Sequence, residues 1–165
     1  MLRDQVCSLA KNNPRKALEK AWKITDPWYR AQAMSWIARF WEGDPMEVAK
    51  HAAKAAGLCE DEYQRTAVRA WEIAAIAERG KLAEARSVLK TALQKAGTVT
   101  PSASRAEALT LLLHAATRID EKEVHQVAEV LHASCSANSH WRCKRAIKDC
   151  ERILNGDEEP RPFFW

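Results

Sequence analysis

The sequence predicts an all-α fold: a right-handed α-solenoid of about four antiparallel helix-turn-helix repeats, in a chain of 165 residues. Alanine and leucine dominate its apolar residues and β-branched residues are few, a composition that favours helix. Proline and glycine stand where helices would begin and end. An arginine followed by an alanine-rich apolar segment recurs at intervals of 39, 36 and 37 residues, at Arg30, Arg69, Arg105 and Arg142. Periods of roughly 20–50 residues are typical of stacked helical repeats.

Four helix starts share one signature. In each, a residue able to cap the helix through its side-chain oxygen precedes a proline, which suits the first helical position because its missing N–H would be unpaired there. The pairs are Asn13–Pro14, Asp26–Pro27, Asp44–Pro45 and Thr100–Pro101. The glycines stand where an apolar pattern ends, as expected for residues that tolerate the left-handed conformation. They are Gly43, Gly57, Gly80, Gly97 and Gly156.

These marks divide the chain into helices joined by short connections. We expect helices at residues 2–11, 14–25, 27–42, 45–56, 60–79, 82–96, 101–119, 121–133 and 138–155. Connections of a few residues make neighbouring helices antiparallel. The eight helices from residue 14 onward then form four pairs, with the arginine in the second helix of each pair. The predicted organisation is a single helical-repeat domain over residues 1–156 and an extended aromatic tail over residues 157–165.

One segment resembles a known repeat family. Residues 80–93 place Ala85, Leu89 and Ala92 in the small–large–small series of the second helix of a tetratricopeptide-type repeat. Similar spacings occur at Ala17, Ala21 and Ile24 and at Ala49, Ala53 and Ala56. The Trp–Leu–Gly–Tyr series of the first helix is missing, and the repeat lengths vary. The chain is similar to the tetratricopeptide-like helical-hairpin solenoids, and this resemblance implies a non-enzymatic interaction module.

The recurring arginines are the first candidate binding residues. Arg30, Arg69 and Arg105 could line a groove that binds carboxylates or phosphates, because the guanidinium offers several fixed donors. Alternatively, these side chains tie one hairpin to the next, with their stems lying on apolar surface.

The second candidate set is aromatic. Four of the seven tryptophans fall between residues 22 and 41. The helix expected at 27–42 carries two apolar stripes, one of them containing Trp36 and Phe40. Both stripes could be core, since a helix between two neighbours needs two buried faces. Otherwise Trp28, Trp36 and Phe40 form a binding patch, because aromatic side chains supply much of the energy at interfaces.

A third cluster contains potential metal ligands. His132 and Cys135 end one predicted helix, and His140 and Cys143 begin the next. Residues three apart share a helix face, so the two pairs could converge on Zn²⁺. The spacing matches no standard zinc pattern, and free cysteine is commonly a small buried apolar residue. We therefore expect no resident metal or cofactor.

The tail combines acidic, proline and aromatic residues. Glu158-Glu159-Pro160-Arg161-Pro162 leads into three terminal aromatics, and alternate prolines favour an extended backbone. We expect the aromatics to fold back and cap the last repeat, because terminal repeats need their open face covered. Alternatively, they enter a neighbouring copy's groove and drive self-association.

The predicted function is non-catalytic binding of a protein or peptide along the concave face of the solenoid. Motifs for phosphate loops, zinc proteases and nucleophilic hydrolases are missing, so we predict no enzyme. The alternative is a mildly basic helical-repeat protein that binds nucleic acid, although the net charge of +4 is low for that class. The apolar runs are too short to cross a membrane. With five cysteines and no recognisable secretory leader, we expect a cytoplasmic protein with reduced thiols.

Overall fold

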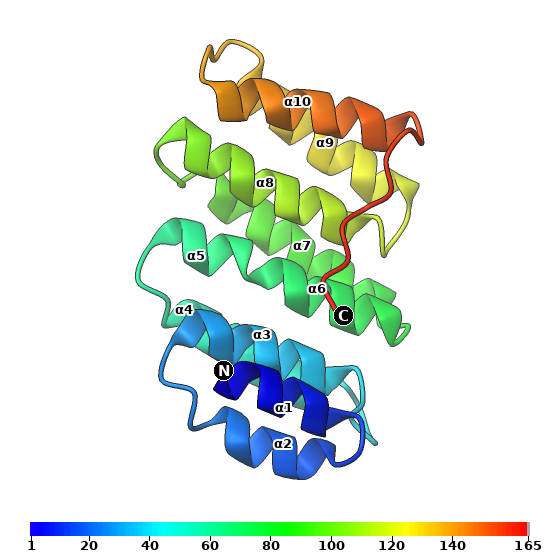
Figure 1. The fold of residues 1–165 in the computed structure, drawn as a ribbon. Helices are drawn as coiled ribbons and strands as arrows, with labels where there is room; N and C mark the ends of the chain where they lie inside the picture. The colour runs from blue at the N-terminus through cyan, green and yellow to red at the C-terminus, as the bar shows by residue number, and fades with distance from the viewer. Residues whose placement is uncertain (165) are drawn as a thin grey trace.

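The computed structural model describes residues 1–164, and this part of the chain is built from helices without a β-strand (Figure 1). The all-α prediction is confirmed. The helices are α1 (Leu2–Ala10), α2 (Pro14–Ala21), α3 (Pro27–Ala38), α4 (Met46–Gly57), α5 (Glu62–Ala67), α6 (Arg69–Glu78), α7 (Leu82–Ala96), α8 (Ser102–Ala116), α9 (Glu121–Cys135) and α10 (Trp141–Leu154). None of these helices is long and apolar enough to cross a membrane.

Three of the four predicted caps form. The Oδ1 atoms of Asn13, Asp26 and Asp44 accept hydrogen bonds of 2.9–3.0 Å from backbone N–H groups in the following turn. The prediction for Thr100 is wrong: α8 begins one residue later, after Pro101, and has no side-chain cap. In the loop before α8, Val99, the residue before Thr100, is fully buried.

The single helix expected at residues 60–79 is interrupted at Val68, which separates α5 from α6. At this point the N–H of Trp71 donates to the carbonyl of Val68, three residues back, at 3.2 Å. Neither glycine nor proline stands there, so the sequence gives no local signal for the interruption. Val68 is fully buried, and α5 and α6 both pack against α4, α7 and α8, whereas α6 packs against α3 as well.

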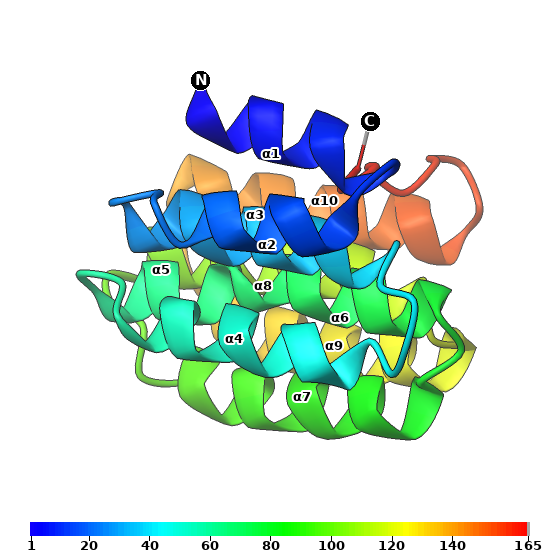
Figure 2. The same cartoon turned by 90° about the horizontal axis from the view of Figure 1, so that it is seen from below.

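The helices form two layers (Figures 1 and 2). One layer contains α1, α3, α5 with α6, α8 and α10 in spatial order, and the other contains α2, α4, α7 and α9. Each arginine-bearing helix packs more extensively on the helix that follows it than on the one before: α3 on α4, α6 on α7 and α8 on α9. The predicted pairing is therefore displaced by one helix, because α1 joins the first layer and pairs with α2.

One hydrophobic core runs through both layers, from Val6 in α1 to Cys150 in α10. Small alanines fill many of its positions, which lets neighbouring helices approach closely. In α3 the residues from Ala31 to Ala38 are all buried, including the polar Gln32 and Ser35. This burial all around the helix arises because α3 has neighbours in its own layer on two sides and α4 behind it.

The C-terminal segment, as far as Phe164, does not cap the last helix pair as expected; Trp165, the third aromatic of that prediction, lies outside the described residues. After α10, Gly156 has a φ of 74°, a conformation that suits glycine, and the chain turns back. It then crosses the first layer in front of α8 and α6 towards α3 (Figure 1). An extended proline-containing chain rises about 3.1 Å per residue, so eight residues span about 25 Å. That is roughly three helix spacings, so the stiff segment reaches α3 and leaves the outer face of α10 uncovered.

Candidate functional site

The first layer carries a groove that holds the segment Glu158–Phe164, here called the docked tail. Phe163 is its main apolar contact and is only 3 % exposed. Its ring meets the ring of Trp71 in α6 edge to face, with 5.3 Å between centroids. The guanidinium of Arg161 lies 5.8 Å from the centroids of both rings. The Phe163 ring therefore packs against an aromatic wall, and one cation lies beside both rings, contacts that the ring quadrupole favours.

Phe164 occupies a second aromatic position. Its ring lies edge to face against Trp36 of α3, with centroids 5.3 Å apart. The guanidinium of Arg39 lies 4.2 Å from the Phe164 centroid. Arg39 also donates to Glu78 at the end of α6, at 3.0 Å from Nη2 to Oε1. This ion pair joins α3 to α6 and holds the guanidinium where it can stack on the tail.

His114 of α8 fixes the backbone of the docked tail. The N–H of Arg161 donates to Nδ1 of His114 at 3.1 Å. The imidazole must be neutral at this nitrogen, since a protonated ring has no acceptor. Burial, assisted by the nearby charge of Arg161, lowers the pKa of His114 to about 4. The bond is therefore available throughout the neutral pH range.

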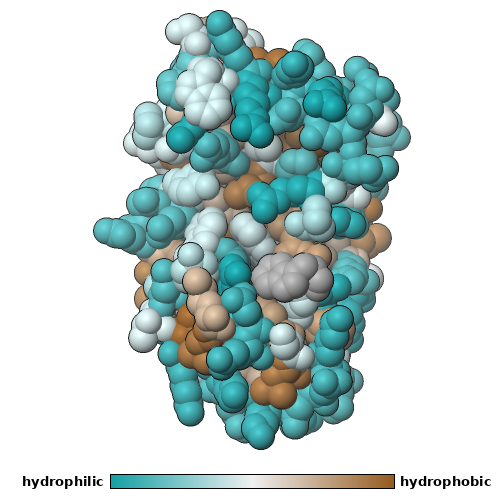
Figure 3. Space-filling view, viewed as in Figure 1, coloured by the Kyte–Doolittle hydropathy of each residue, from teal (hydrophilic) through white to brown (hydrophobic). Residues whose placement is uncertain are grey.

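The aromatic surface continues beyond the tail. Trp71 also meets Trp28 of α3 edge to face at 5.6 Å, and Trp28 stacks on Tyr63 of α5 at 6.2 Å. In Figure 3, brown apolar surface breaks through the teal hydrophilic surface at several places on this face. The layer thus presents a run of rings from α5 to α3, and the tail occupies one end of it.

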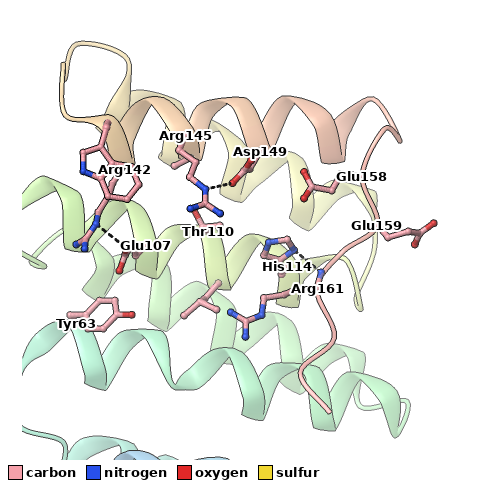
Figure 4. A pocket seen from close by; sticks show the side chains of 13 residues that line it. Tyr63, Glu107, Thr110, His114, Arg142, Arg145, Asp149, Glu158, Glu159 and Arg161 are labelled. Atoms are coloured by element: carbon pink, nitrogen blue, oxygen red, sulfur yellow. Dashed lines mark hydrogen bonds and ion pairs between the residues drawn. The ribbon is translucent and has the colours of Figure 1, made fainter. Parts of the chain in front are cut away.

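A cavity of about 480 Å³ adjoins the docked tail between α8 and α10 (Figure 4). Tyr63 and Trp141 contribute aromatic walls, and charged side chains contribute most of the remainder. Arg142 pairs with Glu107 at 3.1 Å, and Arg145 with Asp149 at 3.5 Å. The lining is therefore polar, and these two arginine charges are balanced by carboxylates of the same lining. Its tail-side border is formed by Glu158, Glu159 and Arg161.

Arg30 and Arg105, two of the predicted binding arginines, make contacts within the scaffold. In each, Nε donates to the carbonyl of the residue six positions earlier: Arg30 to Ile24 at 2.7 Å and Arg105 to Val99 at 3.0 Å. Arg65 makes the same bond to Cys59 at 2.9 Å. These bonds link each helix to a buried residue in the loop that precedes it, three positions before the helix begins. Their geometry agrees with the alternative in which the arginines tie structural elements together.

Arg65, and not Arg69, is therefore the structural equivalent of Arg30 and Arg105. Arg69 instead pairs with Glu72 one turn later in α6, and the Glu72 side chain is 4 % exposed. Burial raises the pKa of Glu72, although the charge of Arg69 opposes the shift. Arg142 also leaves the pattern, since it pairs with Glu107. The sequence match at these two positions did not correspond to an equivalent place in the fold.

The predicted aromatic contacts are partly brought together. Trp36 contacts Phe164 of the docked tail, whereas Trp28 contacts Trp71, which in turn contacts Phe163. Phe40 lies 5.1 Å from the guanidinium of Arg39, the same group that lies 4.2 Å from the Phe164 ring. Trp36 is 3 % exposed, as the core interpretation predicts, and its ring also contacts Phe164 of the docked tail.

Trp71, His114 and Arg39 contact the tail but were not among the predicted site residues. One sequence signal was available for Trp71. It lies two residues before Ile73, roughly on the opposite side of the helix from the apolar stripe of Ile73 and Ile76. Such a tryptophan needs a second apolar neighbour, and the aromatic tail provides it. His114 and Arg39 carry no comparable signal, because their roles depend on where the tail crosses.

The four His and Cys residues considered as zinc ligands make other contacts in the fold. Cys135 and Cys143 are buried together, and burial and the neighbouring Cys143 thiol raise the pKa of Cys135 to about 12. Nδ1 of His140 instead accepts the N–H of Arg142 at 3.2 Å, as a helix cap. Within residues 1–164 no three His, Cys, Asp or Glu side chains are grouped so that they could hold a metal ion.

Comparison with known proteins adds no relative. No protein-family model matches the chain, and neither a curated protein nor a solved structure matches it. The resemblance to tetratricopeptide-like repeats stays a prediction from the sequence. Any functional proposal must therefore start from the groove and its contacts.

Proposed function

We propose that this protein is a non-catalytic scaffold that binds an extended protein or peptide segment across α3, α6 and α8. We further propose that this layer is the concave face of a right-handed, tetratricopeptide-like α-solenoid. One observation carries the proposal: the groove holds the extended segment Glu158–Phe164, with Phe163 almost fully buried against Trp71.

The contacts of the docked tail are those that a groove makes with a bound peptide. The segment has no regular secondary structure of its own, and its two aromatic side chains supply the apolar contacts. Pro160 and Pro162 restrict the unbound segment, which lowers the entropy lost when it docks. A segment from another protein could make the same contacts, because the tail is joined to the scaffold only through α10.

Nucleic-acid binding is less well supported. Arg30 and Arg105 donate to loop carbonyls, while Arg69 and Arg142 are paired with glutamates. Phosphate binding at these positions would have to replace existing partners. The mild net charge of +4 also provides little general attraction for a polyanion.

The proposal can be tested with a chain that ends at Asp157 and a labelled peptide with the sequence of residues 158–165. Fluorescence anisotropy should show saturable one-to-one binding of the peptide to the shortened chain. Trp71→Ala should weaken this binding at least about tenfold, because it removes the wall of the Phe163 position. Trp22→Ala is the matched control, since Trp22 is 49 % exposed and contacts His51 in the other layer.

Circular dichroism and thermal melting should first show that each variant is folded. Binding that is equal in the Trp71→Ala and Trp22→Ala variants would place the peptide outside the groove. Absence of saturable binding to a folded shortened chain would contradict the proposed function.

A further inference from the structure

The docked tail indicates which ligands the groove takes and how its access is controlled. On the basis of the proposed function, we infer that the groove binds protein segments with a four-residue pattern. The pattern is a residue other than proline, then a proline, then two adjacent aromatic residues. We infer also that the chain's own tail is a competitor that such a segment must displace. In this chain the four positions are Arg161, Pro162, Phe163 and Phe164.

The two aromatic positions have different requirements. The first is closed, since Phe163 is 3 % exposed and its ring meets Trp71 of the groove edge to face, and it requires a flat apolar ring. The second is half-open, and its ring meets Trp36 edge to face and lies against the guanidinium of Arg39. An aliphatic side chain would fill some of the second position but would lose the attraction between cation and ring. Two neighbouring aromatics therefore match the groove best.

The backbone contact sets the residue before the proline. His114 needs an N–H two residues ahead of the first aromatic, so that position cannot be proline. The position between them is occupied by Pro162, which has no N–H to leave unpaired. Because proline also disfavours a helical conformation in the residue before it, this arrangement keeps the segment extended.

The covalent link between the tail and α10 indicates whether a second copy of this chain or another protein would displace the tail. A segment joined by a short linker meets its own groove at an effective concentration in the millimolar range. A second copy at micromolar concentration offers the same tail and the same contacts, so it competes at a disadvantage of about a thousandfold. Displacement therefore requires a segment with contacts that the tail lacks.

The cavity between α8 and α10 offers such contacts. Its volume of about 480 Å³ is bordered by the tail at one side but lined mainly by the scaffold, including Tyr63 and Trp141. The tail has to enter from the end of α10, whereas a segment of another protein has no such restriction. A partner segment can place an additional side chain against Tyr63 and Trp141 while it presents the two aromatics to Trp71 and Trp36.

The inference is tested by competition in the full chain. The probe is the labelled peptide of residues 158–165, measured against the full chain, the chain ending at Asp157, and a full-length Phe163→Ala/Phe164→Ala variant. We expect the full chain to bind the probe at least about 100-fold more weakly than the shortened chain. The double variant should recover most of this affinity, because its own tail no longer fills the aromatic positions. It also keeps the test valid if the shortened chain does not fold.

Peptide variants test the ligand class. Phe163→Ala in the probe, or proline in place of Arg161, should each weaken binding to the shortened chain at least about tenfold, whereas Glu159→Gln should leave it within about twofold. Glu159 is exposed and points away from the groove (Figure 4). Equal binding of the alanine or proline peptides would overturn the assigned class.

The possible failures are distinguishable. If neither the shortened chain nor the double variant binds the probe, the proposed function fails as well. If the full and shortened chains bind the probe equally, peptide binding stands but the tail is no competitor. If light scattering shows that the full chain dimerises at micromolar concentration and that deletion of residues 158–165 abolishes the dimer, a second copy is the occupant and the inference is overturned.

Discussion

Nδ1 of His114 accepts the backbone N–H of Arg161 at 3.1 Å, and this bond joins α8 to a segment 47 positions away in the sequence. Arg161 and Arg118 disfavour the protonated imidazole, whereas Asp149 favours it. Burial is the largest influence and lowers the pKa of His114 from 6.5 to about 4. The docked state therefore requires an imidazole that has released its proton.

Docking of the tail should weaken in acid. When the tail is released, His114 regains a pKa near its ordinary value and binds a proton between pH 6.5 and 4. Docking is thus complete above about pH 6.5 and loses up to about 2 kcal/mol as the pH falls towards 4. Hydrogen exchange at the Arg161 amide measures this loss. His114→Asn keeps an acceptor that does not titrate, so persistence of the full pH dependence in this variant would contradict the assignment.

Removal of Arg69 should destabilise the fold more than removal of Arg105. Arg69→Ala leaves the Glu72 carboxylate buried without its partner, which costs about 3 kcal/mol, whereas Arg105→Ala loses mainly one bond to a carbonyl, about 1–2 kcal/mol. Burial already raises the pKa of Glu72, so the Arg69→Ala loss should grow as the pH rises from 5 to 8. Urea unfolding measures both variants. Recovery in an Arg69→Ala/Glu72→Gln double variant would verify the cause, and equal losses for the two arginines would contradict it.

The two tail phenylalanines should contribute unequally to stability. Phe163→Ala removes a fully buried ring and should cost about 3 kcal/mol, whereas Phe164→Ala removes a half-buried ring and should cost about 1 kcal/mol. The free energy of unfolding in urea gives both values. If neither substitution changes it, the tail is undocked in solution, and the peptide-binding proposal loses its main support.

The cysteines should react slowly in the native protein. All five are buried, and burial raises the pKa of Cys7 to about 12 and that of Cys59 to about 11. Because the thiolate is the reactive form, an aromatic disulfide reagent at pH 8 should modify the native thiols at least about 100-fold more slowly than those in urea. The exposed Ser136→Cys variant is the positive control and should add one fast-reacting thiol. Rapid modification of the unsubstituted native protein would show that the core opens readily.

The helix starts could be predicted because their signals are local. Asn13, Asp26 and Asp44 cap their helices through bonds to a backbone N–H two or three residues away. The recurring arginine was only half predicted. Arg30 and Arg105 occupy equivalent places in the fold, but the third equivalent arginine is Arg65. The three share a bond to the carbonyl of the residue six places earlier, and a following alanine does not identify that bond.

The groove could be predicted only as a general region. Trp36 was identified by its aromatic neighbours in the sequence, and it does contact the tail. Arg39 and His114 were missed because each contacts a residue more than 40 positions away, and no local sequence pattern indicates a contact between residues so far apart. The destination of the tail was predicted wrongly for the same reason: its stiffness is visible in the sequence, but the direction in which it leaves α10 is not.

The sequence by itself determined that this chain is helical, where most of its helices begin, and that its last residues are stiff and aromatic. These properties depend on interactions within one or two helical turns. Tertiary structure alone decided which helices share a layer, where α5 gives way to α6, and that Phe163 meets Trp71. Those outcomes depend on burying apolar surface from distant parts of the chain together, and the energy of burial depends on area and shape, not on distance along the sequence.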